Sequence, residues 1–194
     1  MDHDKDVMVD IETMSSWPTA AVIQIGACTF DESSLFLVSV VNTFYGGNSP
    51  QRYHIDPKTV KWWSEQSEEA RASLNMNLVD TPHEALSLFD EWLKSVGFTA
   101  TREGRPGIWA NPPNFDLTIL RHAYRVENRR TPWHYRQERC CRTLWREFGD
   151  LVPVDPSDDD LIKHRADHDA VRQARSAKKI LGYIDAATRG KVGD

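Results

Sequence analysis

The feature that most constrains this chain is a short strand-like segment near the N-terminus, with the sequence DVMVDIE. Side chains alternate between the two faces of a strand. Asp10 and Glu12 therefore share one face, and the opposite face is apolar, formed by Val7, Val9 and Ile11. Two carboxylates this close would repel each other and retain protons unless a cation lay between them. The pair predicts a hard divalent ion; the alternative is a strand end whose acids face solvent.

The order of the elements predicts an α/β fold. Strand patterns at residues 6–11, 20–30 and 35–44 have short connections, which indicates an antiparallel meander. Helical patterns follow at 57–66, 68–74 and 81–97, then a strand at 107–110, a helix near 114–126, a weak strand at 139–142, and helices at 143–148 and 166–189. We expect a mixed five-stranded sheet, with three antiparallel strands and then parallel strands, flanked by helices.

Length and composition predict one domain spanning residues 1–194, with a core of about 5–187, since 194 residues suit one globular unit. Hydrophobic residues make up 40% and charged residues 27%, which excludes a disordered or fibrous chain. No apolar run approaches the ~20 residues that span a bilayer, and no apolar signal region is seen. We therefore expect a cytoplasmic protein without membrane contact. Three cysteines without regular spacing exclude a disulfide framework and a zinc ribbon.

The charge is unevenly distributed. A net charge of −5 argues against nonspecific coating of nucleic acid. Between residues 121 and 146, however, eight arginines stand beside only two acids, Glu127 and Glu138. This stretch is either a surface that contacts phosphates or a solvated helix face, and the sequence leaves both interpretations open.

Further candidate ligands lie on two helices. Asp116 shares a helical face with Ile119 and Leu120, where an unpaired carboxylate is costly. It also stands at a helix start, where an acid favours the helix dipole, and both interpretations can hold together. Asp169 lies near the start of the last helix, with His164 five residues earlier.

Other chemistries lack their motifs. His164 and His168 have the i, i+4 spacing of a zinc protease, but Glu does not follow His164 as that motif requires. The chain has no GxSxG for a serine nucleophile and no glycine-rich nucleotide-binding loop.

Taken together, the motifs resemble those of the DEDDh exonucleases, of the ribonuclease-H-like superfamily. The matches are VDIET at residues 9–13, NPPNFD at 111–116 and HRADHDA at 164–170. A further stretch at 55–71, IDPKTVKWWSEQSEEAR, and the triplet Arg142-Thr143-Leu144 resemble the branch with exonuclease VIII, DexA-like phage exonucleases and small 3′-exoribonuclease-like proteins. In this chain His168 directly precedes Asp169, which leaves His164 at the general-base position and His168 as an alternative.

The resemblance implies a 3′–5′ exonuclease that releases nucleoside 5′-monophosphates with two Mg²⁺ or Mn²⁺ ions about 3.5–4 Å apart. Asp10 would bridge both ions, Glu12 and Asp169 would complete the site of the attacking water, and Asp116 would hold the second ion. His164 would take the proton from that water. The partner would be the 3′ end of a DNA or RNA strand.

Four residues are expected to contact the substrate: Thr13, Met14, Trp109 and Asn111. Thr13 and Met14 resemble family positions at the terminal nucleotide, although turn packing explains Met14 equally well. Trp109 would stack on a base or pack in the core. Of Trp62 and Trp63, one is expected to pack inward and the other to line a groove or a subunit contact.

Two rival functions are weighed. A non-catalytic nucleic-acid-binding module of the same fold would lack a ligand or the histidine, and here all five positions are filled. A phosphatase, or a nuclease cutting within RNA–DNA hybrids, would carry a fourth acid in place of His164. DNA versus RNA, strandedness and oligomeric state stay open, with a homodimer as one expectation.

Overall fold

The central element is one six-stranded sheet with the order β4-β3-β2-β1-β5-β6. It is seen in a computed structural model that describes residues 3, 5–41, 52–152 and 160–189. The strands are β1 (Val7–Thr13), β2 (Val22–Thr29), β3 (Leu35–Val40), β4 (Leu78–Val79), β5 (Ile108–Ala110) and β6 (Glu138–Cys140). The first three pair antiparallel, and β5 and β6 extend the sheet in parallel with β1, as predicted.

The predicted number of five strands is wrong. The additional strand is β4, which runs parallel to β3. It is two residues long, too short to display an alternating pattern. Its pairing with β3 is a tertiary contact that the local sequence does not encode. The predicted third strand extended to residue 44, and its last three residues lie outside the described part of the chain.

The helices are α2 (Pro57–Ser64), α3 (Glu68–Ser73), α4 (Pro82–Ser95), α5 (Asp116–Val126), α6 (Cys141–Phe148) and α7 (Ala166–Arg189), with 3-10 turns η1 (Tyr135–Gln137) and η2 (Gly149–Leu151). The helix α6 begins two residues before the predicted start, because the Cys140 sulfur accepts a hydrogen bond from the Thr143 backbone N–H and caps it. Within the described ranges, no helix combines the length and apolar character that crossing a membrane requires.

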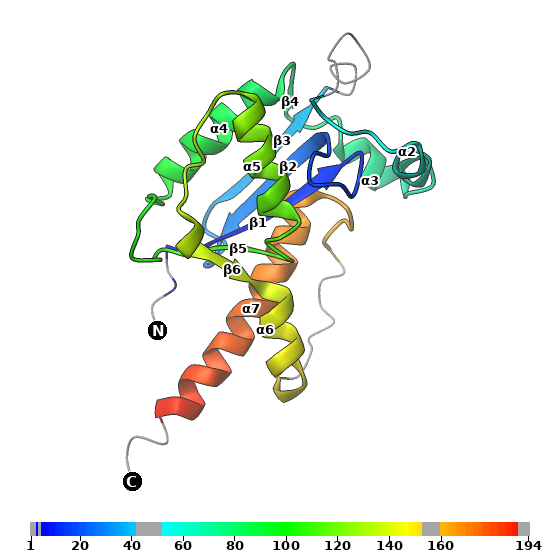
Figure 1. The fold of residues 1–194 in the computed structure, drawn as a ribbon. Coiled ribbons are helices and arrows are strands. Elements are labelled where there is room, and N and C mark those ends of the chain that lie inside the picture. The colour runs from blue at the N-terminus through cyan, green and yellow to red at the C-terminus, as the bar shows by residue number, and fades with distance from the viewer. Residues whose placement is uncertain (1–2, 4, 42–51, 153–159, 190–194) are drawn as a thin grey trace.

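The helices cover both faces of the sheet (Figure 1). On one face, Val9 and Ile11 of β1 pack in a large apolar cluster with residues of α4 and α5, among them Phe89 and Leu120. On the other face, Met8 packs in a smaller cluster with the alanine stripe of α7 and with Cys141 of α6. The alternation predicted for β1 is therefore confirmed, and Asp10 and Glu12 belong to the α7 face.

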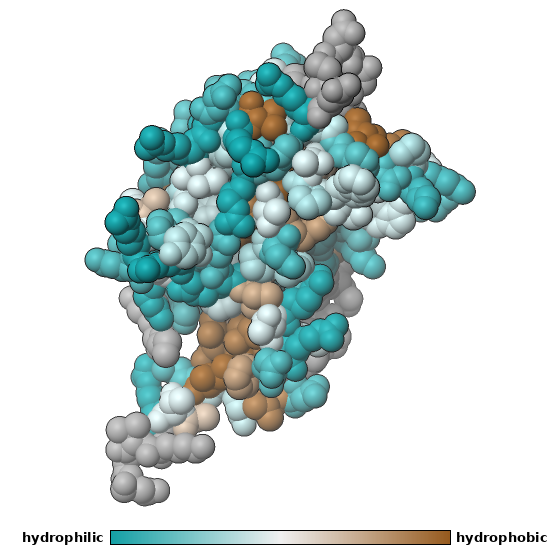
Figure 2. Space-filling model, in the orientation of Figure 1, coloured by the Kyte–Doolittle hydropathy of each residue, from teal (hydrophilic) through white to brown (hydrophobic). Residues whose placement is uncertain are grey.

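Apolar side chains also reach the surface beside this smaller cluster. Figure 2 shows them gathered where α6 and α7 lie together. Phe148 and Leu151 are exposed there, and Leu181 is partly buried. The expected homodimer stays a prediction.

The start of α7 lies directly on β2. A Cβ atom at Gly26 would lie 2.1 Å from the backbone of Ala166 and Asp167, so only glycine permits this approach. Beside it, the buried Gln24 side chain accepts a hydrogen bond of 2.9 Å from the Ala166 N–H. Gly26 pairs with Asp10 in the sheet register. The contact therefore brings the start of α7 next to the acidic strand.

Replacing Gly26 with alanine should destabilise the fold, because the added methyl meets backbone that has no freedom to rotate away. Overpacking of this kind costs about 1–3 kcal/mol or more in urea-induced unfolding. Gly182→Ala on α7 is the matched control: its Cβ would meet nothing within 4 Å. That control should gain about 0.5–1 kcal/mol, since alanine favours a helix interior. Equal unfolding midpoints for the two variants would contradict the close approach.

Candidate active site

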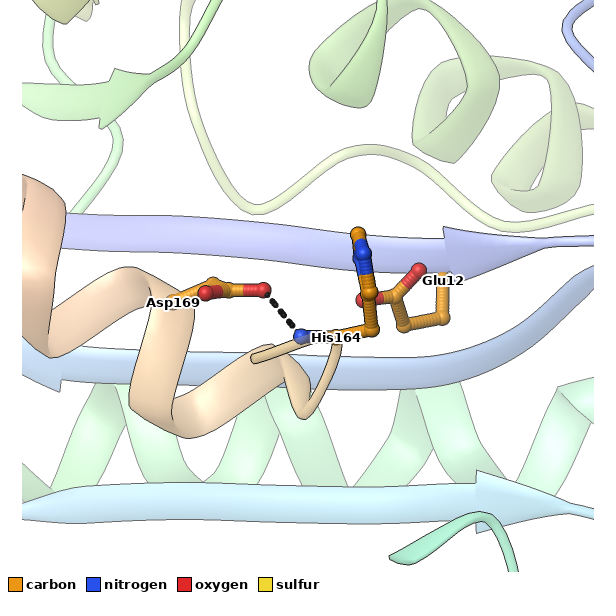
Figure 3. Close-up of side chains that lie close together, drawn as sticks. All are labelled: Glu12, His164 and Asp169. Carbon is orange, nitrogen blue, oxygen red and sulfur yellow. Dashed lines mark hydrogen bonds between the residues drawn. The ribbon is translucent and has the colours of Figure 1, made fainter. Parts of the chain in front are cut away.

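Three predicted site residues meet beside the end of β1. Three atoms lie within 4.8 Å of one another: a carboxylate oxygen of Glu12, a carboxylate oxygen of Asp169 and an imidazole nitrogen of His164. Figure 3 shows the His164 ring next to the Glu12 carboxylate, with Asp169 one helical turn away on α7. Glu12 is only 9% exposed, so its carboxylate is held inside the protein. The acidic strand and the His-x4-Asp motif thus form one cluster.

Asp116 reaches the same region from the other side of β1. Strands β1 and β5 are parallel, so both end at one edge of the sheet, and the chain leaves β5 there to begin α5 at Asp116. The Asp116 side chain is buried, as predicted for its apolar helix face. Within the described ranges, its Oδ2 atom is buried without a hydrogen-bond partner.

The pKa shifts show that the acids interact electrostatically. Burial, followed by the charges of Asp169 and Asp116, raises the pKa of Glu12 to about 8. The pKa of Asp10 is raised well above its usual range by burial and then by Asp116, Glu12 and Asp169, against a lowering hydrogen bond from Gln173. Burial also raises the pKa of Asp116 to about 7. The four carboxylates therefore occupy one electrostatic site, in which the nearby positive charges do not offset burial and repulsion at Asp10 and Glu12.

This donor set fits divalent cations. Carboxylate oxygens are the ligands that Mg²⁺ and Mn²⁺ prefer. The unpartnered Oδ2 of Asp116 is a buried acceptor that a cation would satisfy. A cation would also offset the repulsion that raises the pKa values of Asp10 and Glu12. The residues suited to hold metal are thus those of the sequence motif, and His164 is close enough to Glu12 to serve as a ligand itself.

His164 and His168 occupy different environments. The His164 backbone N–H donates to Asp169 Oδ2 at 2.9 Å, which ties the loop before α7 to the acid cluster. His168 uses its Nδ1 to accept the Ile162 N–H at 2.8 Å, so this ring fastens the loop. Burial lowers the pKa of both imidazoles. His164 is therefore the histidine whose ring lies among the acids.

Two residues of α7 near the site were missed in the sequence. Gln173 donates from Nε2 to Asp10 Oδ1 at 2.7 Å, and Arg172 forms an ion pair with Asp169. They follow Asp169 at i+3 and i+4, the spacing that brings helix side chains to one face, so this signal could have found them. Gln173 fixes the orientation of the carboxylate on the central strand.

The expected substrate residues differ in their accessibility. Trp109 is 5% exposed and donates its indole N–H to the buried Asp6 at 2.9 Å. Its burial leaves no ring face for a base, so the core interpretation replaces the stacking one. The Thr13 hydroxyl donates to the Ser15 carbonyl, within the turn after β1. Met14 and Asn111 are partly buried near the ends of β1 and β5.

Several arginines between residues 121 and 146 form contacts within the fold. Arg121 pairs with Glu138, Arg129 pairs with Asp90, and Arg139 donates to the Gly104 carbonyl at 2.6 Å. These contacts join elements of the fold. Arg142 differs, because it is exposed, donates to the Asn111 carbonyl, and its charge lowers the pKa of Asp116. Arg142 thus lies beside the acid cluster.

The mixed sheet and the flanking helices form a fold of the ribonuclease-H-like type. A family model described as the 3′-5′ exoribonuclease Rv2179c-like domain matches residues 5–184, and the chain belongs to that family. The predicted resemblance to DEDDh exonucleases is thereby confirmed.

Two solved structures share the fold. The crystal structure of cell-death related nuclease 4 (CRN-4) aligns with a TM-score of 0.59 and 16% identity, over 92% of this chain and 64% of that chain. The chain thus spans less than two thirds of that relative's length. The nuclease domain of 3′hExo, a DEDDh family member bound to rAMP, aligns with a TM-score of 0.56 and 13% identity, over 91% of each chain. No curated protein matches.

The acid cluster predicts an unusual pH dependence for the metal-free protein. Glu12 and Asp116 have folded pKa values of about 8 and about 7. Both ionise near pH ~4 in an unfolded chain, so the folded state binds more protons in between. In EDTA, the melting temperature should therefore fall as pH rises from about 5 to about 8. Added Mg²⁺ should raise it, and more at the higher pH.

Asp116→Asn provides the control, since it removes one buried charge at nearly constant shape. Its metal-free melting temperature should depend less on pH, and Mg²⁺ should stabilise it less. A metal-free wild-type protein that becomes more stable across the same pH range would contradict the clustering of these acids.

Proposed function

We propose that this chain removes nucleotides one at a time from the 3′ end of RNA, using two divalent ions and releasing nucleoside 5′-monophosphates. A single domain with a core of about 5–187 would carry the activity. The observation that supports this most directly is the cluster itself: acids from β1, α5 and α7 share one electrostatic site with His164. RNA is proposed as the substrate because the matching family is described as exoribonucleases.

Asp10, Glu12, Asp116 and Asp169 would hold the ions. Bound there, divalent ions would activate water and neutralise charge on the phosphate. The protein contributes the rigidity of this site. Gln173 holds the Asp10 carboxylate through a 2.7 Å hydrogen bond. Pairing of β1 with β2 fixes the backbone on which Asp10 and Glu12 lie, with both side chains on one face of the sheet. Polar groups that are already held in place do not have to reorient during the reaction. Such preorganised electrostatic stabilisation is usually the largest single contribution to catalysis.

His164 would act as the general base. Burial lowers its pKa below the usual value, so the imidazole is neutral near pH 7 and can accept a proton from water. Its ring lies beside Glu12, and its backbone N–H is bonded to Asp169. The ring is partly exposed, so the proton can pass from an imidazole nitrogen to solvent.

Arg142 would contact a phosphate of the substrate strand. It is exposed and lies near Asp116 and Asn111, at the edge where β5 ends. A guanidinium offers paired donors in a geometry that suits phosphate oxygens. Met14, partly buried after β1, would pack against the terminal nucleotide.

The activity is tested with 5′-labelled RNA and DNA, single- and double-stranded. With Mg²⁺ or Mn²⁺ we expect stepwise shortening of RNA, release of nucleoside 5′-monophosphates seen by chromatography, and arrest by EDTA. Asp10→Asn, purified identically, should leave no ladder, because the central ligand loses its charge. Persistence of the ladder in that variant would reveal a contaminant. Products of internal cleavage alone, or shortening of DNA but not RNA, would contradict the proposal.

The base assignment is tested by comparing His164, on the loop before α7, with His168 in the first turn of that helix. His164→Ala should lower kcat by about 10²–10⁴-fold, the range typical of a general base. His168→Ala should leave kcat nearer to wild type and lower the melting temperature, because the loop loses the bond from Ile162. A larger loss of kcat in the His168 variant would move the base role to that residue.

A further inference from the structure

The tandem tryptophans of α2 lie in the segment that resembles one exonuclease branch. Trp63 is 4% exposed, and its indole N–H donates to the Thr13 carbonyl at 3.0 Å. Thr13 directly follows Glu12 on β1. The bond therefore fastens α2 to the strand that carries the acids, 50 residues away in the sequence.

Trp62 stands between this anchor and solvent. It is 39% exposed, and its ring meets that of Trp63 edge-on, with centroids 5.1 Å apart and an interplanar angle of 77°. The same indole meets the His164 imidazole at 4.9 Å and 81°, while Trp63 lies 6.3 Å from that imidazole at 78°. Perpendicular rings at these separations attract each other. The His164 ring thus packs against two indoles.

The main chain of His164 is held in a strained conformation. Its φ is 62°, in the left-handed region that residues with a Cβ rarely adopt. The hydrogen bond from its backbone N–H to Asp169 holds the main chain of the loop but leaves the side-chain torsions free. Among the ring contacts of the described residues, those to His164 come from Trp62 and Trp63. These contacts restrict the imidazole to the side of Glu12.

We propose that Trp62, backed by Trp63, is a positioning residue that holds the His164 imidazole in its reactive orientation. The inference rests on the proposed role of His164 as general base. Trp62 acts through that ring. The two adjacent tryptophans then have separate roles: Trp63 anchors α2 to β1, and Trp62 orients the His164 imidazole.

The contact itself is tested without substrate or metal. In the NMR spectrum, the imidazole C–H resonances of His164, identified by their loss in His164→Ala, should be displaced by the indole ring current. Trp62→Leu should return them toward random-coil positions, and Trp62→Phe should keep part of the displacement. Unmoved resonances in Trp62→Leu would overturn the proposal, whatever the enzymatic activity of the protein.

The role is tested by kinetics on 5′-labelled RNA. Trp62→Leu should lower kcat on the order of 10- to 100-fold with little change in KM, since a misplaced base slows the chemical step. Trp62→Phe should recover most of the loss. In a His164→Ala background, Trp62→Leu should have no further effect. The control Trp145→Leu, a 45% exposed tryptophan on α6, should keep wild-type kcat.

Three kinetic outcomes would overturn the proposal. A raised KM with unchanged kcat, or a full effect of Trp62→Leu in the His164→Ala background, would show that Trp62 contacts the substrate directly. Wild-type activity in His164→Ala, with the ring-current shifts as expected, would refute the base assignment and leave Trp62 only a packing contact. Melting temperatures of all variants separate these effects from unfolding.

Discussion

Repulsion among four clustered carboxylates, two of them buried, is the constraint on which the rest of this structure depends. Asp10, Glu12, Asp116 and Asp169 come from three elements far apart in the sequence. Burial raises the pKa values of the first three, and repulsion from neighbouring acids adds to the shifts of Asp10 and Glu12. A fold that ignored function would separate such groups, because buried like charges destabilise it. Their convergence is stable only if the surrounding packing is strong enough to hold them or a cation offsets the repulsion.

The packing that holds them is concentrated where α7 meets β2. Gly26 lets the backbone of Ala166 come into direct contact, and Gln24 accepts the Ala166 N–H while it also donates to Ser39 and to the Ser73 carbonyl. Each of these β2 residues pairs in register with an acid of β1. Strand β2 thus makes the contacts that position the start of α7, and with it Asp169. It lies next to β1, the strand that carries Asp10 and Glu12.

Features with a local pattern could be predicted from the sequence, and features that depend on distant contacts could not. The alternation in β1 gave the correct face for Asp10 and Glu12, and the alanine stripe of α7 gave the correct extent of that helix. The two-residue β4 was missed because its pairing with β3 has no local signal. For Trp109 the sequence favoured a core position but left base stacking open, and its burial and its bond to Asp6 decide for the core.

The site combines rigid acids with a histidine on a loop, and the two parts have different requirements. Ligands for ions gain from a sheet and a helix, because small displacements weaken several contacts at once. A general base must approach water and then release its proton to solvent, so burial as complete as that of Asp116 would disable it. A loop provides the exposure but not the orientation. In the proposed mechanism the half-exposed Trp62 would resolve this conflict, since an aromatic ring on one side of His164 would restrain the imidazole and leave its other side open.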